Sequence, residues 1–438
     1  MTLAIENPEI RFFGKVPEHW EIVRIRRITK EHKQGYYTEQ AYIDEGVKLV
    51  RITDIDDSAN VSFENMPFVT ISSKDERAFK VEKGDFLFAR SGTIGRFGLV
   101  REPERSVFAS YLIRFRFKDV NLEFLRFVFS SQFFKEGLIS TLHGGANKNV
   151  HAENIKEQFI AIPPPDMQSE IASFLDRKTA ALATLITKKQ RLIQLLEEKR
   201  TVLINQAVTK GLNSNILMRD SGISWIGKVP EHWEIVRIRR ITKEHKQGYY
   251  TEQAYIDEGV KLVRITDIDD SANVSFENMP FVTISSKDER AFKVEKGDFL
   301  FARSGTIGRF GLVREPERSV FASYLIRFRF KDVNLEFLRF VFSSQFFKEG
   351  LISTLHGGAN KNVHAENIKE QFIAIPPSNV QGAIEQVEIA NFLDSESAAI
   401  NQVIDRIKEQ IEKLQEYRQT LITAAVTGKI DVREEVAV

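Results

Sequence analysis

The chain has 438 residues, of which 42% are hydrophobic and 28% charged, with 62 Lys and Arg against 61 Asp and Glu. At roughly 150 residues per domain this length predicts two to four domains, and the composition excludes disordered, collagen-like and low-complexity proteins. Cysteine is absent, which excludes disulfides, thiolate metal sites and cysteine nucleophiles. Because the net charge is only +1, any binding to nucleic acid must come from local patches.

No segment approaches the ~18 uninterrupted apolar residues that a membrane span requires. The N-terminal residues also lack the basic and then apolar plan of a signal peptide. We therefore expect a cytoplasmic protein that makes no contact with a membrane.

A long internal repeat organises the chain. Residues 14–164 recur without a single change at 227–377, so the repeated unit is 151 residues long. A unit of this size is a tandem domain and not a solenoid repeat, which is typically about 20–45 residues. The two domains must recognise the same thing.

Within the repeat, apolar runs bounded by turn residues predict strands, and longer amphipathic stretches predict helices. In chain order, strands are predicted at 47–53, 66–71, 85–89, 97–101 and 107–117, and helices at 121–142 and 151–157. The aromatic residues at helical spacing in the longer helix are predicted to be core: Phe124, Phe127, Phe129, Phe133 and Phe134. The repeat is therefore a mixed α/β domain.

A second, divergent repeat follows each domain and has the apolar spacing of a coiled coil. The predicted seam of the first helix comprises Leu175, Leu182, Ile186, Ile193, Leu196 and Leu203. That of the second helix comprises Leu393, Ile400, Ile404, Ile407, Ile411, Leu414 and Leu421. Lys189 stands where the second helix has Ile407, and Gly211 and Gly428 stand where C-caps are expected.

The charges of the two helices favour pairing with each other. Residues 175–212 carry eight basic and three acidic side chains, whereas residues 393–430 carry five and six. We predict one antiparallel pair of roughly 55 Å, and the alternative is two independent helices that each pack on their own domain. The predicted fold is an α+β multidomain chain, with two mixed α/β globular domains separated by a long antiparallel two-helix coiled coil. The predicted boundaries are 1–164, 165–213, 214–377 and 378–438.

The segment RSGTIGRFG is the first candidate binding element. A glycine-rich loop after a strand can cradle phosphate with its amides, although the Gly-Lys-Ser/Thr ending of a P-loop is missing. The alternative is a tight turn between strands. The candidate contacts are Arg90, Ser91, Thr93 and Arg96, with the copies Arg303, Ser304, Thr306 and Arg309.

The segment HGGANKNVHAEN at 143–154 is the second candidate. Its asparagines can bond an adenine and its lysine can meet guanine or phosphate, and the alternative is a surface loop that caps the next helix. The candidate contacts are Asn147, Lys148 and Asn149, with the copies Asn360, Lys361 and Asn362. We expect no metal site here, because a third ligand is missing beside His143 and His151.

The segment KEHKQGYYTEQAY at 30–42 is the third candidate, because basic and aromatic residues alternate in it as they do in nucleic-acid patches. An ordinary strand edge is the alternative. The candidate contacts are Lys33, Tyr36 and Tyr37, with the copies Lys246, Tyr249 and Tyr250. The nearby Asp54, Asp56 and Asp57 are interpreted as scaffold and not as a nuclease centre.

Catalytic motifs are absent from the sequence. It contains no nucleotide-binding loop, no methyltransferase tetrapeptide of the Asn/Asp-Pro-Pro-Tyr type and no Ser–His–Asp signature. We therefore expect no catalytic residues in this chain.

The combination of motifs resembles a known family. WIGKVPEHWEIVRI opens a domain that ends in FIAIPP, a helix with IASFLD and KRTVLINQAVTKG follows, and the whole cassette occurs twice. This resembles the specificity subunit of Type I restriction-modification systems, in which two target recognition domains alternate with two helices that form an antiparallel coiled coil. The departures are the identical domains, RFF in place of a leading Trp before Gly14, and Val-Thr-Gly-Lys at the end of the second helix.

The resemblance implies a non-catalytic subunit that reads double-stranded DNA and joins two methyltransferase and two restriction subunits. It also implies that this chain binds no cofactor, and that S-adenosylmethionine, ATP and magnesium belong to the partners. Identical readers related by a two-fold predict a bipartite, palindromic target with a non-specific spacer. The alternative function is a protein–protein scaffold or decoy of the same fold, and the missing motifs argue against a single-chain enzyme.

Overall fold

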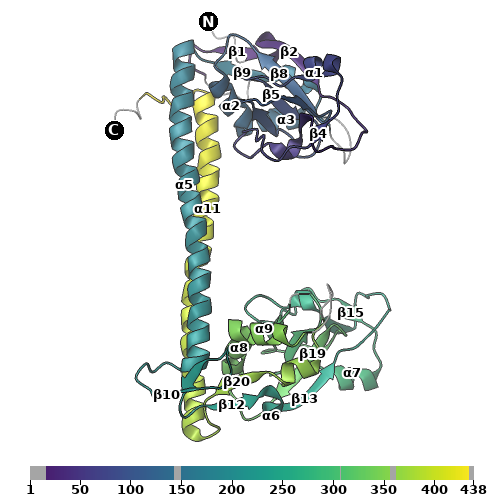
Figure 1. Cartoon of the computed structure of the whole chain (residues 1–438), viewed down its shortest axis with the longest axis vertical. Helices are drawn as coiled ribbons and strands as arrows, with labels where there is room; N and C mark the ends of the chain where they lie inside the picture. Colours follow the sequence, from purple (N-terminus) through teal and green to yellow (C-terminus); the bar gives the residue numbers. More distant parts are fainter. Residues whose placement is uncertain (1–15, 143–148, 306, 356–361, 434–438) are drawn as a thin grey trace. The chain divides into compact units, whose positions relative to one another are not determined.

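A computed structural model describes residues 16–142, 149–305, 307–355 and 362–433. The chain divides into two compact units, one formed by residues 1–189 and 408–438 and the other by residues 190–407. Each unit contains one copy of the repeat together with parts of two long helices (Figure 1). The mixed α/β class predicted for the repeat is thereby confirmed for both copies.

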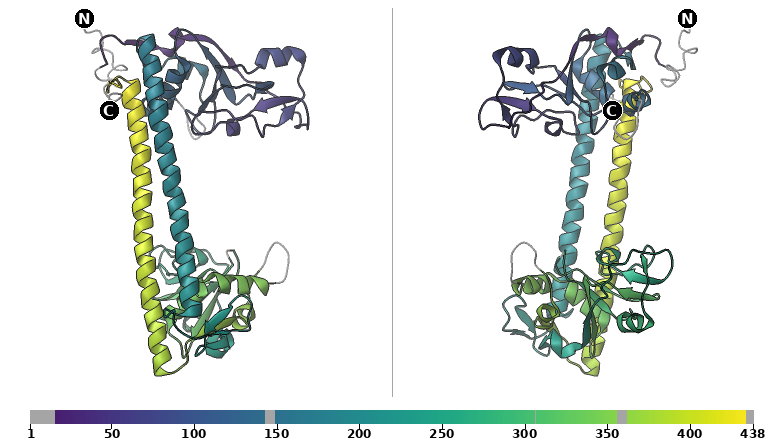
Figure 2. Two further views of the ribbon diagram at one scale, coloured as in Figure 1. Left: turned by 60° about the vertical axis from the view of Figure 1, so that its left-hand side comes forward. Right: turned by 90° about the vertical axis from the view of Figure 1, so that its right-hand side faces the viewer.

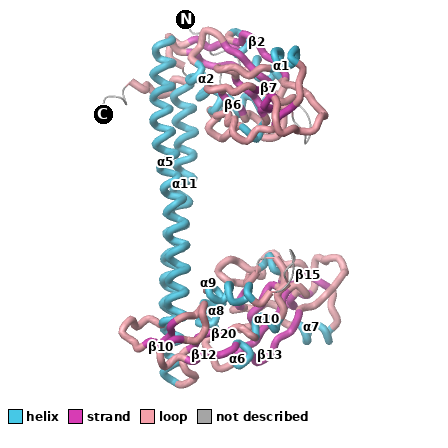
Figure 3. The backbone as a smooth tube through the Cα atoms, in the orientation of Figure 1, coloured by secondary structure: helices cyan, strands magenta, loops and turns pink. Residues whose placement is uncertain are grey.

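The domain of the first unit has short strands and short helices (Figure 3). Its strands are β1 (Glu21–Arg24), β2 (Thr29–Gln34), β3 (Val47–Val50), β4 (Phe68–Val69), β5 (Phe86–Ala89), β6 (Phe97–Leu99), β7 (Ser106–Phe108), β8 (Leu112–Phe117) and β9 (Phe159–Ile162). Its helices are α1 (Ser73–Phe79), α2 (Leu122–Ser130), α3 (Gln132–Ser140) and α4 (Ala152–Lys156). The strands form an antiparallel sheet β2-β8-β5-β6, a sheet β4-β3-β7 in which β3 and β7 are parallel, and the pair β1-β9.

Strand β5 explains how the domain builds its core. All four of its residues are buried, and side chains of a strand alternate between the two faces of the sheet. Phe86 and Phe88 enter the cluster that contains α2 and α3, whereas Leu87 and Ala89 enter a second cluster on the other face. The four-stranded sheet is therefore covered on both sides, which is why this strand is apolar throughout.

The prediction of one strand over 107–117 is wrong. The chain turns at Ala109–Tyr111, where the N–H of Leu112 donates to the carbonyl of Ala109 at 2.9 Å. Before the turn β7 pairs with β3, and after it β8 pairs with β2 and β5 in a different sheet. One continuous apolar run therefore contributes strands to two sheets, and the turn between these strands cannot be recognised from hydrophobicity.

The prediction of one helix over 121–142 is also wrong. Ser131 has extended backbone angles and ends α2, and its hydroxyl accepts the N–H of Phe134 at 3.2 Å as the N-cap of α3. The core assignment of the aromatic residues is confirmed for Phe124, Phe127, Phe129 and Phe134, which are buried, while Phe133 is partly buried. The short strands β1, β2 and β9 and the helix α1 were not predicted.

The domain of the second unit repeats these elements. Its strands are β12 (Glu234–Arg237), β13 (Thr242–Gln247), β14 (Val260–Val263), β15 (Phe281–Val282), β16 (Phe299–Ala302), β17 (Phe310–Leu312), β18 (Ser319–Phe321), β19 (Leu325–Phe330) and β20 (Phe372–Ile375). Its helices are α6 (Ile238–Ile241), α7 (Ser286–Phe292), α8 (Leu335–Ser343), α9 (Gln345–Ser353) and α10 (Ala365–Lys369). A hairpin of β10 (Met218–Asp220) and β11 (Lys228–Pro230) precedes β12.

Two long helices, α5 (Pro165–Lys210) and α11 (Val380–Val426), contribute to both units. In the first unit, the start of α5 and the end of α11 share the domain core through Leu175 and Leu421. In the second unit, the end of α5 and the start of α11 do so through Val208 and Leu393. Within each unit the two helical segments therefore run antiparallel, side by side (Figure 2).

The thirteen seam positions are buried or partly buried, as expected for an interface between two helices. Both helices end before a glycine with a positive φ, +70° at Gly211 and +72° at Gly428, the conformation that favours glycine as a C-cap. In the part of the chain that the structure describes, no helix is both long enough and apolar enough to span a membrane.

Candidate nucleic-acid interface

The turn Ala109–Tyr111 holds the segment that follows β2. The backbone N–H of Tyr36 donates to the carbonyl of Phe108 at 2.7 Å. The preceding residue, Gly35, approaches the turn so closely that a Cβ would lie 2.0 Å from the carbonyl oxygen of Ala109. Glycine at this position therefore lets Tyr36 and Tyr37, two of the predicted contacts, lie beside the turn.

The same turn contacts the glycine-rich segment, which itself contacts the loop before α4. The N–H of Arg90 donates to the carbonyl of Tyr111 at 2.8 Å, and its guanidinium Nη1 lies 3.5 Å from the carbonyl of Ser110. The N–H of Val150 donates to the carbonyl of Arg90 at 2.7 Å, which brings the exposed Asn149 to this surface. Three predicted segments that are distant in the sequence therefore meet at one place.

The second domain reproduces this arrangement. Its donor and acceptor pairs are Tyr249 to Phe321 (2.7 Å), Arg303 to Tyr324 (2.8 Å) and Val363 to Arg303 (2.7 Å), with Tyr250 and Asn362 exposed beside them. Some of the predicted contacts lie outside the described residues: Asn147, Lys148, Thr306, Asn360 and Lys361.

The glycine-rich segment is the turn between β5 and β6. The N–H of Ala89 donates to the carbonyl of Arg96 at 2.9 Å, and Gly92 and Gly95 have φ of +81° and +80°. Its structure is therefore the tight turn that was the alternative to a phosphate cradle. Ser91, like its copy Ser304, is half-buried and Thr93 is exposed, and these residues stay predicted phosphate contacts.

The ammonium group of Lys33 makes its contacts within the domain. Its Nζ donates to the carbonyl of Ala78 at 3.0 Å and lies 4.5 Å from the centroid of the Phe79 ring. Lys246 makes the same contacts with Ala291 and Phe292. These lysines are therefore placed to hold α1 and α7 against the sheet.

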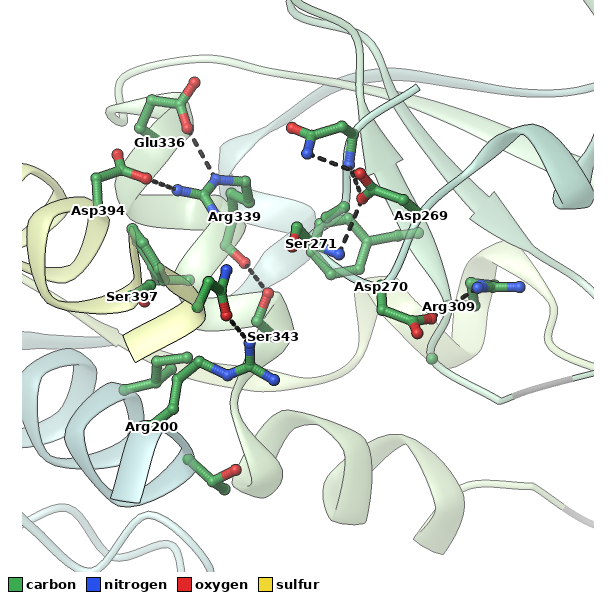
Figure 4. A pocket seen from close by; sticks show the side chains of 18 of the residues that line it. Arg200, Asp269, Asp270, Ser271, Arg309, Glu336, Arg339, Ser343, Asp394 and Ser397 are labelled. Atoms are coloured by element: carbon green, nitrogen blue, oxygen red, sulfur yellow. Dashed lines mark hydrogen bonds and ion pairs between the residues drawn. The ribbon is translucent and has the colours of Figure 1, made fainter. Parts of the chain in front are cut away.

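Arg96 and its copy Arg309 lie at a different place from Arg90. Arg96 pairs with Asp57 at 2.7 Å, and Arg309 lines a pocket of about 760 Å³ between the second domain and its two helical segments (Figure 4). The pairs in this pocket are Arg309 with Asp270, Arg339 with Glu336 and Asp394, and Arg200 with Asn401. Because each guanidinium has a partner, the pocket is best described as a polar joint between the domain and its helices.

The three aspartates near β3 shape their own loop. Asp54 pairs with Arg51 at 2.8 Å, and Asp56 accepts the N–H groups of Ser58 and Asn60 at 2.8 Å each. Among the described residues, no group of three His, Asp or Glu side chains is placed to hold a metal ion. The geometry therefore agrees with a scaffold role for Asp54, Asp56 and Asp57.

Sequence reasoning missed two tyrosines, Tyr42 and Tyr111, of which Tyr111 belongs to the turn itself. Both border the same hollow as Tyr36 and Tyr37. A signal was available, because each repeat contains 15 phenylalanines but only four tyrosines. Where a domain fills its core with phenylalanine, its few tyrosines are candidates for a shared surface.

Comparisons with known proteins place the chain in one family. The chain matches the family described as Type I restriction modification DNA specificity domain twice, over residues 17–196 and 230–413. It is 22% identical to the specificity subunit of the Type I restriction enzyme MjaVIII from Methanocaldococcus jannaschii, over 96% of this chain and 95% of that protein. It is also 22% identical to the EcoKI specificity subunit from Escherichia coli K12, over 95% and 90%.

Solved structures have the same fold. One, from a study of complex assembly and conformational transition of the type I restriction-modification system, aligns with a TM-score of 0.71 at 16% identity and covers 95% of this chain and all of that chain. The HsdS subunit from Thermoanaerobacter tengcongensis aligns with a TM-score of 0.54 at 16% identity, over 98% of this chain and all of that chain.

The chain therefore belongs to the Type I restriction-modification DNA specificity family, as its motifs led us to expect. It is a specificity subunit, the non-catalytic component of such a system, and the catalytic activity lies in partner subunits.

Proposed function

We propose that this chain reads a bipartite, palindromic DNA target, with a spacer that its two long helices determine. The observation that carries the proposal is the identity of residues 14–164 and 227–377. Two domains with the same side chains read the same bases, with phosphate contacts setting the register. A symmetric target then requires only that the domains are related by a two-fold.

Equivalent docking of the domains on their helices supports the symmetry. In the first unit the N–H of Asn121 donates to Gln168 of α5 at 2.7 Å, and in the second that of Asn334 donates to Gln386 of α11 at 2.7 Å. Each docking point lies near the start of its helix. A two-fold rotation that exchanges two antiparallel helices also exchanges their start points, and therefore the two docking points. Identical readers related in this way bind an inverted repeat, as dimeric repressors do.

The proposed complex contains two methyltransferase subunits and two restriction subunits, assembled in the cytoplasm. The partners carry S-adenosylmethionine, ATP and magnesium, and this chain supplies sequence recognition and a scaffold. The length of the helices, at ~1.5 Å per residue, sets the number of unread base pairs between the two half-sites.

Single-molecule methylation sequencing tests this function. A host that lacks other adenine methylation should express the chain with its cognate methyltransferase subunit. We expect a gapped palindrome with a modified adenine in each half. An asymmetric motif would contradict the two-fold, whereas an assembled complex without any methylation motif would favour a scaffold or decoy that does not read DNA.

A further inference from the structure

All four tyrosines of the first domain line a single hollow. They come from the segment after β2 and from the turn between β7 and β8, and the hollow has a volume of about 490 Å³. We call it the tyrosine hollow, and its aromatic residues are Tyr36, Tyr37, Tyr42 and Tyr111. The remaining lining includes Gln40, Arg51 and Ser110.

Three of the four tyrosines are much more exposed than the phenylalanines of the same domain. Tyr37, Tyr42 and Tyr111 are 63%, 57% and 61% exposed, whereas each of the fifteen phenylalanines is buried or partly buried. An exposed aromatic ring with a hydroxyl is costly to leave in water but well suited to an interface that is partly polar. This difference in exposure between the tyrosines and the phenylalanines indicates that the hollow contacts a ligand.

The second domain has the same exposed tyrosines. Tyr250, Tyr255 and Tyr324 are 65%, 56% and 62% exposed. Both copies also hold the first of these rings in the same way, since the hydroxyl of Tyr37 donates to Glu39 at 2.7 Å and that of Tyr250 donates to Glu252 at 2.6 Å. The hydrogen bond to Glu39 raises the pKa of Tyr37.

Two arginines differ in their place at the hollow: Arg51 lines it, and Arg90 lies next to it. Arg51 is held by two hydrogen bonds to Asp54, of 3.2 Å from Nε and 2.8 Å from Nη2, so its guanidinium is fixed. Arg90 adjoins the hollow through Ser110 and Tyr111, and in the described part of the domain no carboxylate lies within ion-pair distance of it. Most other arginines of the domain are paired, so Arg90 is a charge available to an anionic ligand.

We propose that the tyrosine hollow is the DNA-reading surface of each domain, with Arg90 on a backbone phosphate and Tyr37, Tyr42 and Tyr111 against base edges. Gln40, which is exposed within the hollow, is the residue that reads a base by hydrogen bonds. This assignment rests on the proposed function and adds Gln40, Tyr42 and Tyr111 to the predicted contacts. The unpaired arginine favours DNA over a protein partner as the occupant.

The first test measures DNA affinity of the chain assembled with its methyltransferase subunit. The probe is a duplex with the motif found for the wild type, compared with a duplex in which both half-sites are scrambled. Tyr111→Ala should weaken binding to the motif about tenfold, and the matched Tyr324→Ala should do the same. The double variant should bind about a hundredfold more weakly, because the two tyrosines belong to separate domains and act independently.

Two further variants separate reading from phosphate binding. Gln40→Ala combined with Gln253→Ala should relax the methylation motif at one symmetric pair of positions. Arg90→Gln combined with Arg303→Gln should weaken both duplexes alike. The slope of log affinity against log salt should then fall by about one for each phosphate that an arginine no longer neutralises.

Tyr417→Ala is the matched control, since Tyr417 is the one tyrosine outside the two repeats and is 51% exposed on α11. It should leave the affinity for the motif duplex unchanged. If the wild type binds the motif duplex and the Tyr111→Ala and Tyr324→Ala double variant binds it with the same affinity, the assignment of the hollow as the DNA-reading surface is overturned and the proposed function stands. Loss of assembly with the methyltransferase subunit in the double variant would identify a protein interface instead. Absence of any motif for the wild type would overturn both proposals.

Discussion

Asp85 is a buried carboxylate that two arginines surround. It is 1% exposed, and it accepts hydrogen bonds from Arg116 Nε at 2.6 Å and from the N–H of Glu82 at 2.8 Å. Nε of the buried Arg114 lies 4.0 Å from Oδ2 of Asp85, the oxygen that accepts the N–H of Glu82. Burial raises the pKa of Asp85 in spite of these partners. The second domain contains the same group around Asp298.

Asp85→Asn should lower the free energy of unfolding by about 2 kcal/mol, because an amide cannot accept from both Arg116 Nε and the N–H of Glu82, and one buried donor is left unsatisfied. Chemical denaturation of the full chain measures this loss, and Asp298→Asn is its replicate in the second unit. Glu76→Gln is the control, since its partner Arg105 is 71% exposed. A surface pair of this kind contributes at most about 1 kcal/mol, so equal losses for the two sites would contradict the prediction.

The same variant tests the sign of a pH effect. Because the pKa of Asp85 is raised in the folded state, the native protein keeps this proton to a higher pH than the unfolded chain. Its contribution to stability therefore falls as the pH rises through the folded pKa. The decline should be smaller in Asp85→Asn than in the wild type, measured as unfolding free energy across a pH series.

Residue types and their spacing predicted burial, whereas the predicted DNA contacts stay predictions. The phenylalanines of α2 and α3 were assigned to the core from spacing alone, because apolar periodicity is local information. Lys33 and Arg96 were equally good candidates on charge, but both have partners inside the domain. Pairing depends on residues far away in the sequence, such as Ala78 and Asp57, and so could not be inferred from a single segment.

Among the elements, the two long helices were the most predictable. Their 3–4 apolar spacing extends over several heptads, and the break at each C-terminal glycine follows from a backbone that requires positive φ. The break at Ser131 was missed because a serine N-cap inside an apolar stretch resembles an ordinary helical position. The strands β7 and β8 were merged because both are apolar and only their partners differ.

Lys189 is a polar residue at a seam position of α5. It is partly buried, and its Nζ donates to Gln410 of α11 at 2.6 Å. Lys189→Ile, which copies the residue at position 407, should raise the free energy of unfolding by about 1 kcal/mol, because a single polar residue in a seam costs stability. Thermal and chemical denaturation measure the gain.

Lys188→Ile is the control for that substitution, since Lys188 is the exposed neighbour on the same helix. It adds the same apolar side chain outside the seam and should leave stability nearly unchanged. If both substitutions stabilise the chain equally, or neither does, position 189 does not belong to a helix–helix seam.

At the scale of the whole molecule, the proposed spacer follows from helix length. Seven residues inserted after Lys189 and seven after Ile407 preserve the heptad register and add ~10.5 Å, which corresponds to about three base pairs. Methylation sequencing should show the same half-sites with a spacer that is about three base pairs longer. An insertion of equal length in the exposed connection at 212–215, outside α5, should leave the spacer unchanged. An unchanged spacer in the doubly extended helices would contradict the proposal.

The tandem repeat, the two helices with their seams and the absence of catalytic motifs can be recognised in the amino-acid sequence alone, because these are patterns of identity or of short period. Which polar residues share a surface follows only from the fold. Tyr36, Arg90, Tyr111 and Asn149 lie in four separate segments. They meet because β7 and β8 belong to different sheets, Tyr36 and Arg90 bond to the chain at the turn between these strands, and the segment of Asn149 bonds to Arg90. Strand pairing over long sequence separations sets such contacts, and no local pattern encodes them.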